Sequence, residues 1–133
     1  METIAQALAI LEDTDQKEKE RVDAAHYLGK NGSEETAFAL VAALDDDDYG
    51  VHWAASEGLA RLGDAAMPAL LRSLARPDCS PRIIEGAKHA FHTSTSHQVQ
   101  TETRPILHAM HGSAQNIDIM QAVSNLMIKL AIN

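Results

Sequence analysis

The stretch Val51-His-Trp-Ala-Ala-Ser-Glu-Gly-Leu-Ala-Arg-Leu-Gly-Asp64 decides the fold, because its pattern recurs at a fixed distance on both sides. Small and apolar residues repeat at a spacing of 31 positions. The matching pairs are Ala24 and Ala55, Leu28 and Leu59, Gly32 and Gly63, Leu40 and Leu71, Ala55 and Gly86, and Ser56 and Ala87. A period of this length is typical of stacked helical hairpins, each of which buries only part of its apolar face alone. The sequence therefore predicts an all-α fold, a short α-solenoid.

Helix-breaking residues between the apolar runs divide the chain into about four hairpins. Asn31-Gly32 closes one helix, and Ser33 is expected to cap the next. Thr36 stands where a capping box has an acid, so the sequence predicts the cap without the box. Thr93-Ser-Thr-Ser96 is expected to loosen the chain before the last helices. We expect a single, complete domain over residues 1–133, capped at both ends, with hairpins at about 3–30, 33–62, 64–92 and 97–132.

Composition and charge restrict the class of partner. Nineteen acids against 11 lysines and arginines give a formal charge of −8, which opposes binding to nucleic acid because phosphate must be neutralised. No apolar run approaches the roughly 20 residues that a membrane span needs. The single cysteine, Cys79, has no partner for an internal disulfide, and a signal-peptide pattern is absent. We therefore expect a soluble, cytoplasmic protein that binds neither nucleic acid nor membrane.

Residues 51–64 resemble the short bacterial HEAT-like repeat, also called the phycobilisome-lyase-type HEAT repeat, whose alanine-rich helix ends in Leu-Gly-x-x-Gly-Asp. Residues 20–33 resemble it less closely, and residues 82–95 keep only the small residues. The second copy retains Arg21, Ala24, Ala25, Leu28, Gly29 and Gly32. The resemblance implies an α-solenoid. The families that share this repeat include bilin lyases, phycobilisome-degradation proteins, deoxyhypusine hydroxylase, alkyl-purine DNA glycosylases and scaffolds without enzymatic activity.

Two of these families place demands on the sequence that can be checked. Deoxyhypusine hydroxylase-like repeats carry a His-Glu pair early in the second helix, but the aligned positions here are Val22-Asp23, Trp53-Ala54 and Ile84-Glu85. The di-iron activity is therefore excluded. The glycosylase-like proteins use a basic groove, which an acidic chain does not readily provide. The sequence predicts no catalytic residues and no cofactor.

The repeat spacing also predicts which side of each second helix is free to bind. The packed stripe is expected to contain Val51, Ala54, Ala55, Gly58, Leu59 and Leu62. The opposite, concave face is expected to contain His52, Trp53, Ser56, Glu57 and Ala60. The 31-residue step then gives three rows: Val22, Trp53 and Ile84; His26, Glu57 and Lys88; and Gly29, Ala60 and Phe91. An apolar row flanked by ionisable groups is typical of a groove for a peptide or helix. The alternative is that the apolar row packs between helices.

From these rows and the positions beside them we select ten candidate residues for binding a partner, with Trp53 as the central anchor. They are Arg21, Val22, His26, His52, Trp53, Ser56, Glu57, Ile84, Lys88 and Phe91.

Histidines and serines suggest a metal site and a catalytic site, for which the sequence offers less support than for the binding surface. His89/His92 and His108/His111 have helical i, i+3 spacing suited to a shared metal ion. Their two helices run antiparallel, so we expect separate half-sites at most and no metal. Ser94, Ser96 and His97 lie in a turn that offers no oxyanion hole, and a solvated loop is the simpler interpretation. We expect the acidic run Asp45–Asp48 to cap the helix that follows it rather than to bind calcium.

Taken together, the residues favour a protein-interaction scaffold that binds a peptide or helix of another protein, and binding rather than catalysis. The alternative, from the resemblance, is an accessory or catalytic subunit in tetrapyrrole handling, similar to bilin lyases or phycobilisome-degradation proteins. A third possibility is a homodimer through the C-terminal helix, which carries Met120, Val123, Leu126, Met127 and Leu130 on one stripe.

Overall fold

The computed structural model describes residues 3–111 and 116–133. All regular structure within these ranges is helical. None of the described helices is long and apolar enough to cross a membrane. The elements are α1 (Ile4–Glu12), α2 (Glu18–Asn31), α3 (Glu34–Ala43), α4 (Tyr49–Leu62), the 3-10 turn η1 (Gly63–Ala66), α5 (Met67–Leu74), α6 (Pro81–Thr93), α7 (His97–Glu102), α8 (Arg104–His111) and α9 (Asn116–Leu130).

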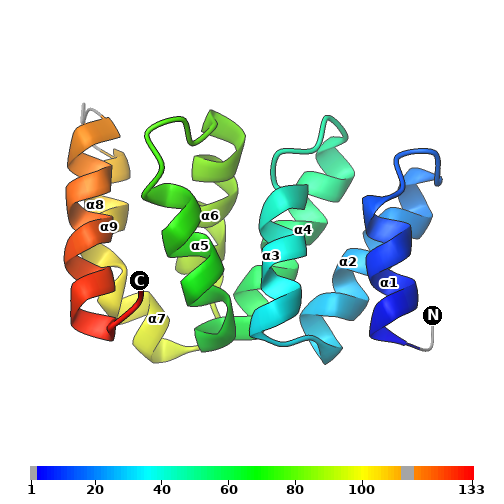
Figure 1. The fold of residues 1–133 in the computed structure, drawn as a ribbon, viewed down its shortest axis with the longest axis horizontal. Coiled ribbons are helices and arrows are strands. Elements are labelled where there is room, and N and C mark those ends of the chain that lie inside the picture. The colour runs from blue at the N-terminus through cyan, green and yellow to red at the C-terminus, as the bar shows by residue number, and fades with distance from the viewer. Residues whose placement is uncertain (1–2, 112–115) are drawn as a thin grey trace.

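The helices form two layers (Figure 1). The first layer contains α1, α3, α5 and α9, and the second contains α2, α4, α6 and α8. Each helix contacts its hairpin partner in the other layer and its neighbours in its own, with the most extensive packing between α2 and α4. This is the stack of helical hairpins that the 31-residue period predicts, and the all-α solenoid fold is confirmed.

The last hairpin is inverted relative to the others. In the first three hairpins the chain passes from the first layer to the second, but α8 packs beside α6 in the second layer and α9 returns to pack against α5. The short helix α7 makes this possible, because it carries the chain from the end of α6 across to α8 (Figure 1). The C-terminal end of the stack therefore differs in topology from the repeats before it.

Close contact between α2 and α4 depends on two glycines. A Cβ atom added to Gly29 would lie 2.5 Å from the Cα atom of Gly58. A Cβ atom on Gly58 would lie 3.0 Å from the carbonyl oxygen of Ala25. The backbones of the two helices touch directly here.

Residues at helical spacing on facing surfaces form one continuous core between the layers. In α5, for example, Met67, Leu70, Leu71 and Leu74 are buried. The largest fully buried apolar side chains in the described residues are Phe91, Leu11, Leu28, Leu40, Leu44, Leu59, Leu70, Leu71, Leu74, Ile106 and Val51.

Several helices begin after a residue whose side chain accepts a capping hydrogen bond, namely Thr3, Asp48, Ser80 and Ser96. Ser33 precedes α3 as expected, but its backbone N–H also donates to Thr36 Oγ1 at 2.8 Å, so a capping box is present after all. Threonine takes the place of the usual acid because its hydroxyl reaches the same N–H. Gly63 ends α4 with φ of 59°, a left-handed conformation that favours glycine.

Candidate functional site

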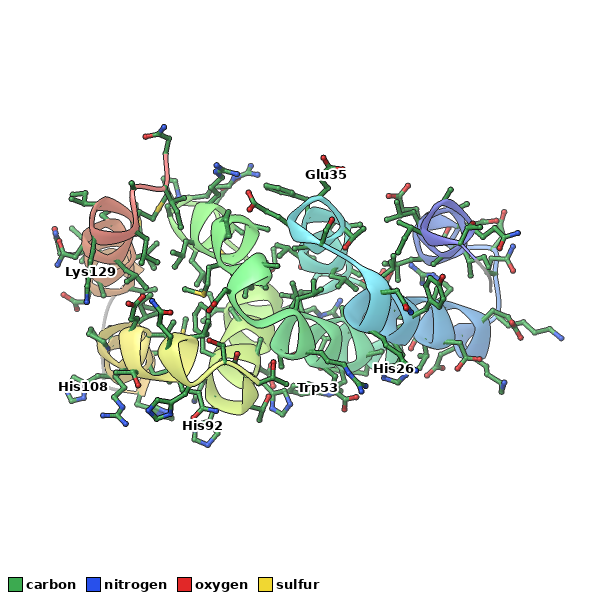
Figure 2. The ribbon with its side chains drawn as sticks, turned by 90° about the horizontal axis from the view of Figure 1, so that it is seen from below. His26, Glu35, Trp53, His92, His108 and Lys129 are labelled. Atoms are coloured by element: carbon green, nitrogen blue, oxygen red, sulfur yellow. The ribbon has the colours of Figure 1, made fainter. Side chains whose placement is uncertain are left out.

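The second layer presents the outer surface on which most of the predicted binding residues lie. Figure 2 shows His26, Trp53 and His92 along this surface, with Glu35 on the opposite side of the molecule. His26 Nε2 lies 3.1 Å from Glu57 Oε2, although the two residues are 31 positions apart. The repeat step therefore places these two members of one row side by side. Both side chains are about half exposed.

The first predicted row, Val22, Trp53 and Ile84, is neither fully exposed nor in the core. All three residues are partly buried. Val22 and Ile84 pack against the core from its edge. Trp53 makes edge-to-face contacts with His52, at 4.6 Å between ring centroids, and with His89, at 5.3 Å. These ring contacts favour one orientation of the indole on the second-layer surface.

Four candidate residues, Arg21, His52, Ser56 and Phe91, are buried, so the expectation that they lie on an open face is wrong. Ser56 Oγ donates to the carbonyl oxygen of Gly86 at 2.8 Å and so joins α4 to α6. Phe91 is 0% exposed and belongs to the core. Gly29 and Ala60, which share its row, are buried as well. A helix in the middle of a stack packs against three neighbours, so its buried surface is wider than one stripe.

Arg21 and His52 are buried because they bond to the ends of first-layer helices. Arg21 Nε and Nη2 donate to the carbonyl oxygen of Leu11 at 3.0 and 2.9 Å. His52 Nδ1 lies 2.6 Å from the carbonyl oxygen of Leu44, and since that oxygen only accepts, Nδ1 carries the proton. These contacts satisfy carbonyl groups that have no partner within their own helices.

The acidic run Asp45–Asp48 is held by basic side chains from both neighbouring repeats. Arg21 donates to both carboxylate oxygens of Asp46, at 3.2 and 2.6 Å. Arg82 Nη1 donates to the carbonyl oxygen of Asp46 and to Asp47 Oδ1, both at 3.0 Å. As expected, Asp48 caps α4 by accepting from the N–H of Gly50. The run therefore acts as a structural link between three hairpins.

Two opposing effects set the pKa of Asp46. Burial alone would raise it, but the hydrogen bonds from Arg21 and from the backbone N–H of Asp48, together with the positive charges of Arg21 and Arg82, outweigh burial. The pKa therefore lies below its ordinary value. The carboxylate is held ionised as part of the ion pair, which is a structural role.

A cleft of about 300 Å³ opens on the second-layer surface beside Trp53. We call it the Trp53 cleft. It lies where α4, α6 and α8 meet. Its walls are formed by Trp53, Glu85, Lys88, His89, His92, Leu107 and His111.

The sequence pattern does not predict the Trp53 cleft, because the cleft forms only where the last hairpin is inverted. Leu107 and His111 come from α8, which lies next to α6 only because the last hairpin is reversed. His89, His92 and His111 line the same cleft, although they come from helices that the sequence assigned to separate half-sites. His108 is exposed and does not line it. Among the described residues, no three His, Cys, Asp or Glu side chains are grouped closely enough to hold a metal ion.

The segment Thr93–Ser96 is firmly attached to the fold rather than loose. The backbone N–H of Thr95 donates to the carbonyl oxygen of Ala60 at 3.0 Å. Ser94 is buried, and its Oγ accepts from the N–H of Ser96. Ser96 Oγ donates to Asp64 Oδ1 at 2.8 Å and accepts from the N–H of Val99. Both serines are therefore engaged in structural hydrogen bonds. His97, the third residue considered for catalysis, is exposed at the start of α7.

The methionine-containing stripe of α9 faces inward. Val123 and Leu126 are buried, and Met120, Met127 and Leu130 are partly buried. The exposed apolar residues of this helix are instead Ile117, at 71% exposed, and Ile128, at 80%.

Comparison with known proteins agrees with this geometry. A model of the family described as HEAT repeats matches residues 4–91, about two thirds of the chain. The match covers α1 to α6 up to Phe91 and stops before the inverted hairpin. None of the curated proteins matches the sequence. With the stacked hairpins of its structure and this family match, the chain belongs to the HEAT-repeat family.

Proposed function

We propose that this chain binds a peptide or helix of another protein on the outer surface of its second layer, with Trp53 as the anchor. HEAT repeats are generally protein-interaction scaffolds. The surface consists of the row His26, Glu57 and Lys88 and the Trp53 cleft beside it. We also propose that the protein acts in the cytoplasm, because its single cysteine does not provide the disulfide framework common in small secreted domains.

The position of Trp53 is the observation that carries this proposal. The side chain is partly exposed, forms one wall of a cleft and is held edge-on by two imidazole rings. A tryptophan with a fixed orientation loses little conformational entropy when a partner covers it, and such residues contribute most to binding at interfaces. A core tryptophan would instead be covered by its own chain.

The tetrapyrrole alternative is supported less well by the shape of the site. The cleft volume of about 300 Å³ is at the lower limit for small-molecule sites, and Trp53 is the only residue among its walls with a large aromatic ring system. If this alternative is correct, a bilin added to the purified protein will acquire induced circular dichroism, which Trp53→Ala will abolish.

Affinity capture from host extract tests the proposed binding surface. The variant Trp53→Ala/Glu57→Ala/Lys88→Ala is expected to lose a partner that the wild type retains. A matched control, Phe38→Ala/Glu35→Ala/Lys129→Ala, removes one aromatic, one acidic and one basic side chain elsewhere; Glu35 and Lys129 are exposed, as is part of Phe38. The control is expected to retain the partner. Equal loss from both variants, or from neither, contradicts the proposal.

Thermal unfolding separates loss of binding from loss of structure. Because Trp53 is only partly buried, the triple variant is expected to unfold cooperatively, with a stability loss of about 1–2 kcal/mol. A collapse of stability would mean that Trp53 is mainly a packing residue.

Self-association through the C-terminal helix remains a separate proposal. A dimer at this end has Ile117 and Ile128 available, since the methionine stripe faces inward. Sedimentation equilibrium of wild type and Ile128→Gln at high protein concentration tests it, and a monomeric wild type contradicts it.

A further inference from the structure

The Trp53 cleft differs in charge from the molecule as a whole. The chain has a formal charge of −8. In the cleft, however, Lys88, His89, His92 and His111 are accompanied by one acid, Glu85. Three of the seven histidines of the chain therefore line one small cleft. The helical spacing of Glu85, Lys88, His89 and His92 directs four of these groups from a single face of α6.

The cleft also offers apolar surface. Trp53 forms one wall and Leu107, from α8, contributes to another. Both residues are partly buried, so each keeps some surface that a ligand can cover. A partner that fits both features has one large apolar side chain for the wall and carboxylates for the surrounding basic groups.

We propose that the Trp53 cleft binds an acidic segment of a partner protein through one large apolar residue and flanking carboxylates, with an affinity that rises as the pH falls. This inference rests on the proposed function and adds the chemistry of the partner. A neutral imidazole accepts a proton as the pH falls, and each proton so gained makes the cleft more positive. The protein then discriminates between partners by charge, and the discrimination depends on pH.

The groups that face the cleft determine the direction of this dependence. From α6 come Glu85, Lys88, His89 and His92, and from α8 comes His111. From α4 comes Trp53, which does not titrate, and Glu57 further along that helix is paired with His26. At alkaline pH the charges of Glu85 and Lys88 offset each other. Each proton taken up by an imidazole then adds a positive charge, and carboxylates bind more strongly.

Selection from a library of random peptides of about 16 residues tests the partner chemistry without knowledge of the natural partner. The library is selected for binding to the wild-type protein at about pH 5.5, and peptides that also bind the Trp53→Ala variant are discarded. Enriched peptides are expected to carry aspartates or glutamates around one large apolar residue. One enriched peptide that contains no tryptophan is then synthesised. Its affinity is measured by the fluorescence of Trp53, which is the only tryptophan of the chain.

Affinity for that peptide is expected to be about tenfold higher at pH 5.5 than at pH 8, which corresponds to a few weak ion pairs. His89→Gln/His92→Gln/His111→Gln should remove the pH dependence. The control His97→Gln/His108→Gln, at exposed sites outside the cleft, should retain it. Glu85 is exposed and is the one acid among the described residues that line the cleft, so Glu85→Gln should strengthen binding by a few fold.

The outcomes separate this inference from the proposed function. Enrichment of neutral or basic peptides that depend on Trp53 overturns the inference and leaves the binding surface in place. An acidic peptide whose affinity is the same at both pH values overturns the pH dependence. Failure to enrich any peptide that depends on Trp53 contradicts both proposals.

Discussion

Arg21 and His52 lie 31 residues apart and make the same contact, since each donates a hydrogen bond to a carbonyl oxygen at the end of the preceding first-layer helix. Their acceptors are Leu11 in α1 and Leu44 at the end of α3. The repeat thus keeps a position and a function while the residue type changes from arginine to histidine. Only the arginine reaches further, to Asp46, and joins the acidic run to α2.

Replacement of Arg21 by methionine should destabilise the protein strongly. The substitution removes the donor to the carbonyl oxygen of Leu11 and leaves the partly buried carboxylate of Asp46 with the backbone N–H of Asp48 but without its ion-pair partner. Removing one partner of such a pair costs about 3 kcal/mol. The control is Lys19→Met on the same helix, which breaks an exposed pair with Asp23 and should cost less than about 1 kcal/mol. Urea unfolding measures both values, and similar losses would show that the Arg21 network contributes little.

The ion pair between Arg21 and Asp46 should make the folding stability depend on pH in the acidic range. Because the pKa of Asp46 is lower in the folded protein than its ordinary value, ionisation of this carboxyl stabilises the fold. That contribution is complete above the unfolded carboxyl pKa of about 3.9 and is lost as the pH falls through the lower, folded pKa. The stability difference between wild type and Arg21→Met should therefore shrink between pH 7 and about pH 2.5. A difference that stays constant would argue against this linkage.

Gly29→Ala should separate α2 from α4. The added Cβ atom would lie 2.5 Å from Gly58 Cα, and backbone atoms cannot move aside as a flexible side chain can. Overpacking of this kind costs about 1–3 kcal/mol. Gly50→Ala is the matched control, because its Cβ atom meets mainly the end of the Glu18 side chain. The control should be neutral or stabilising by up to about 1 kcal/mol, as measured by thermal unfolding.

Ser96→Ala should cost about 1 kcal/mol, because Ser96 Oγ both caps α7 and donates to Asp64. A solvated loop residue would show no such effect. Ser124→Ala, at an exposed position of α9, serves as control and should change stability by less than about 0.5 kcal/mol. Calorimetric melting of the two variants provides the comparison.

Cys79 should react slowly with disulfide reagents. Burial raises the pKa of its thiol, against an opposing hydrogen bond from Ser73, so less of the reactive thiolate is present at neutral pH. The reaction rate of the folded protein with an aromatic disulfide should lie below that of the urea-unfolded chain and continue to rise at pH values where the unfolded chain has levelled off. Equal rates in both states would refute an elevated pKa.

The repeat spacing and the helix-end residues were sufficient to predict the general architecture. Small residues 31 positions apart indicated helices that pack closely, and Ala24, Ala55 and Gly86 are all buried. The same step predicted that His26 and Glu57 belong to one row, and their side chains are 3.1 Å apart. Both results depend on local helix geometry and a constant repeat, which a single sequence contains.

What the sequence by itself determined, then, is the stack of hairpins and the order of residues along each row. Tertiary structure decided which rows are buried. A helix with one buried stripe would leave His52, Ser56 and Phe91 exposed, but neighbouring helices bury all three. It also decided the inverted last hairpin, and with it the cleft that brings His111 toward Trp53. Helical periodicity describes one helix at a time, whereas burial and clefts arise from the number and placement of the helices that surround it.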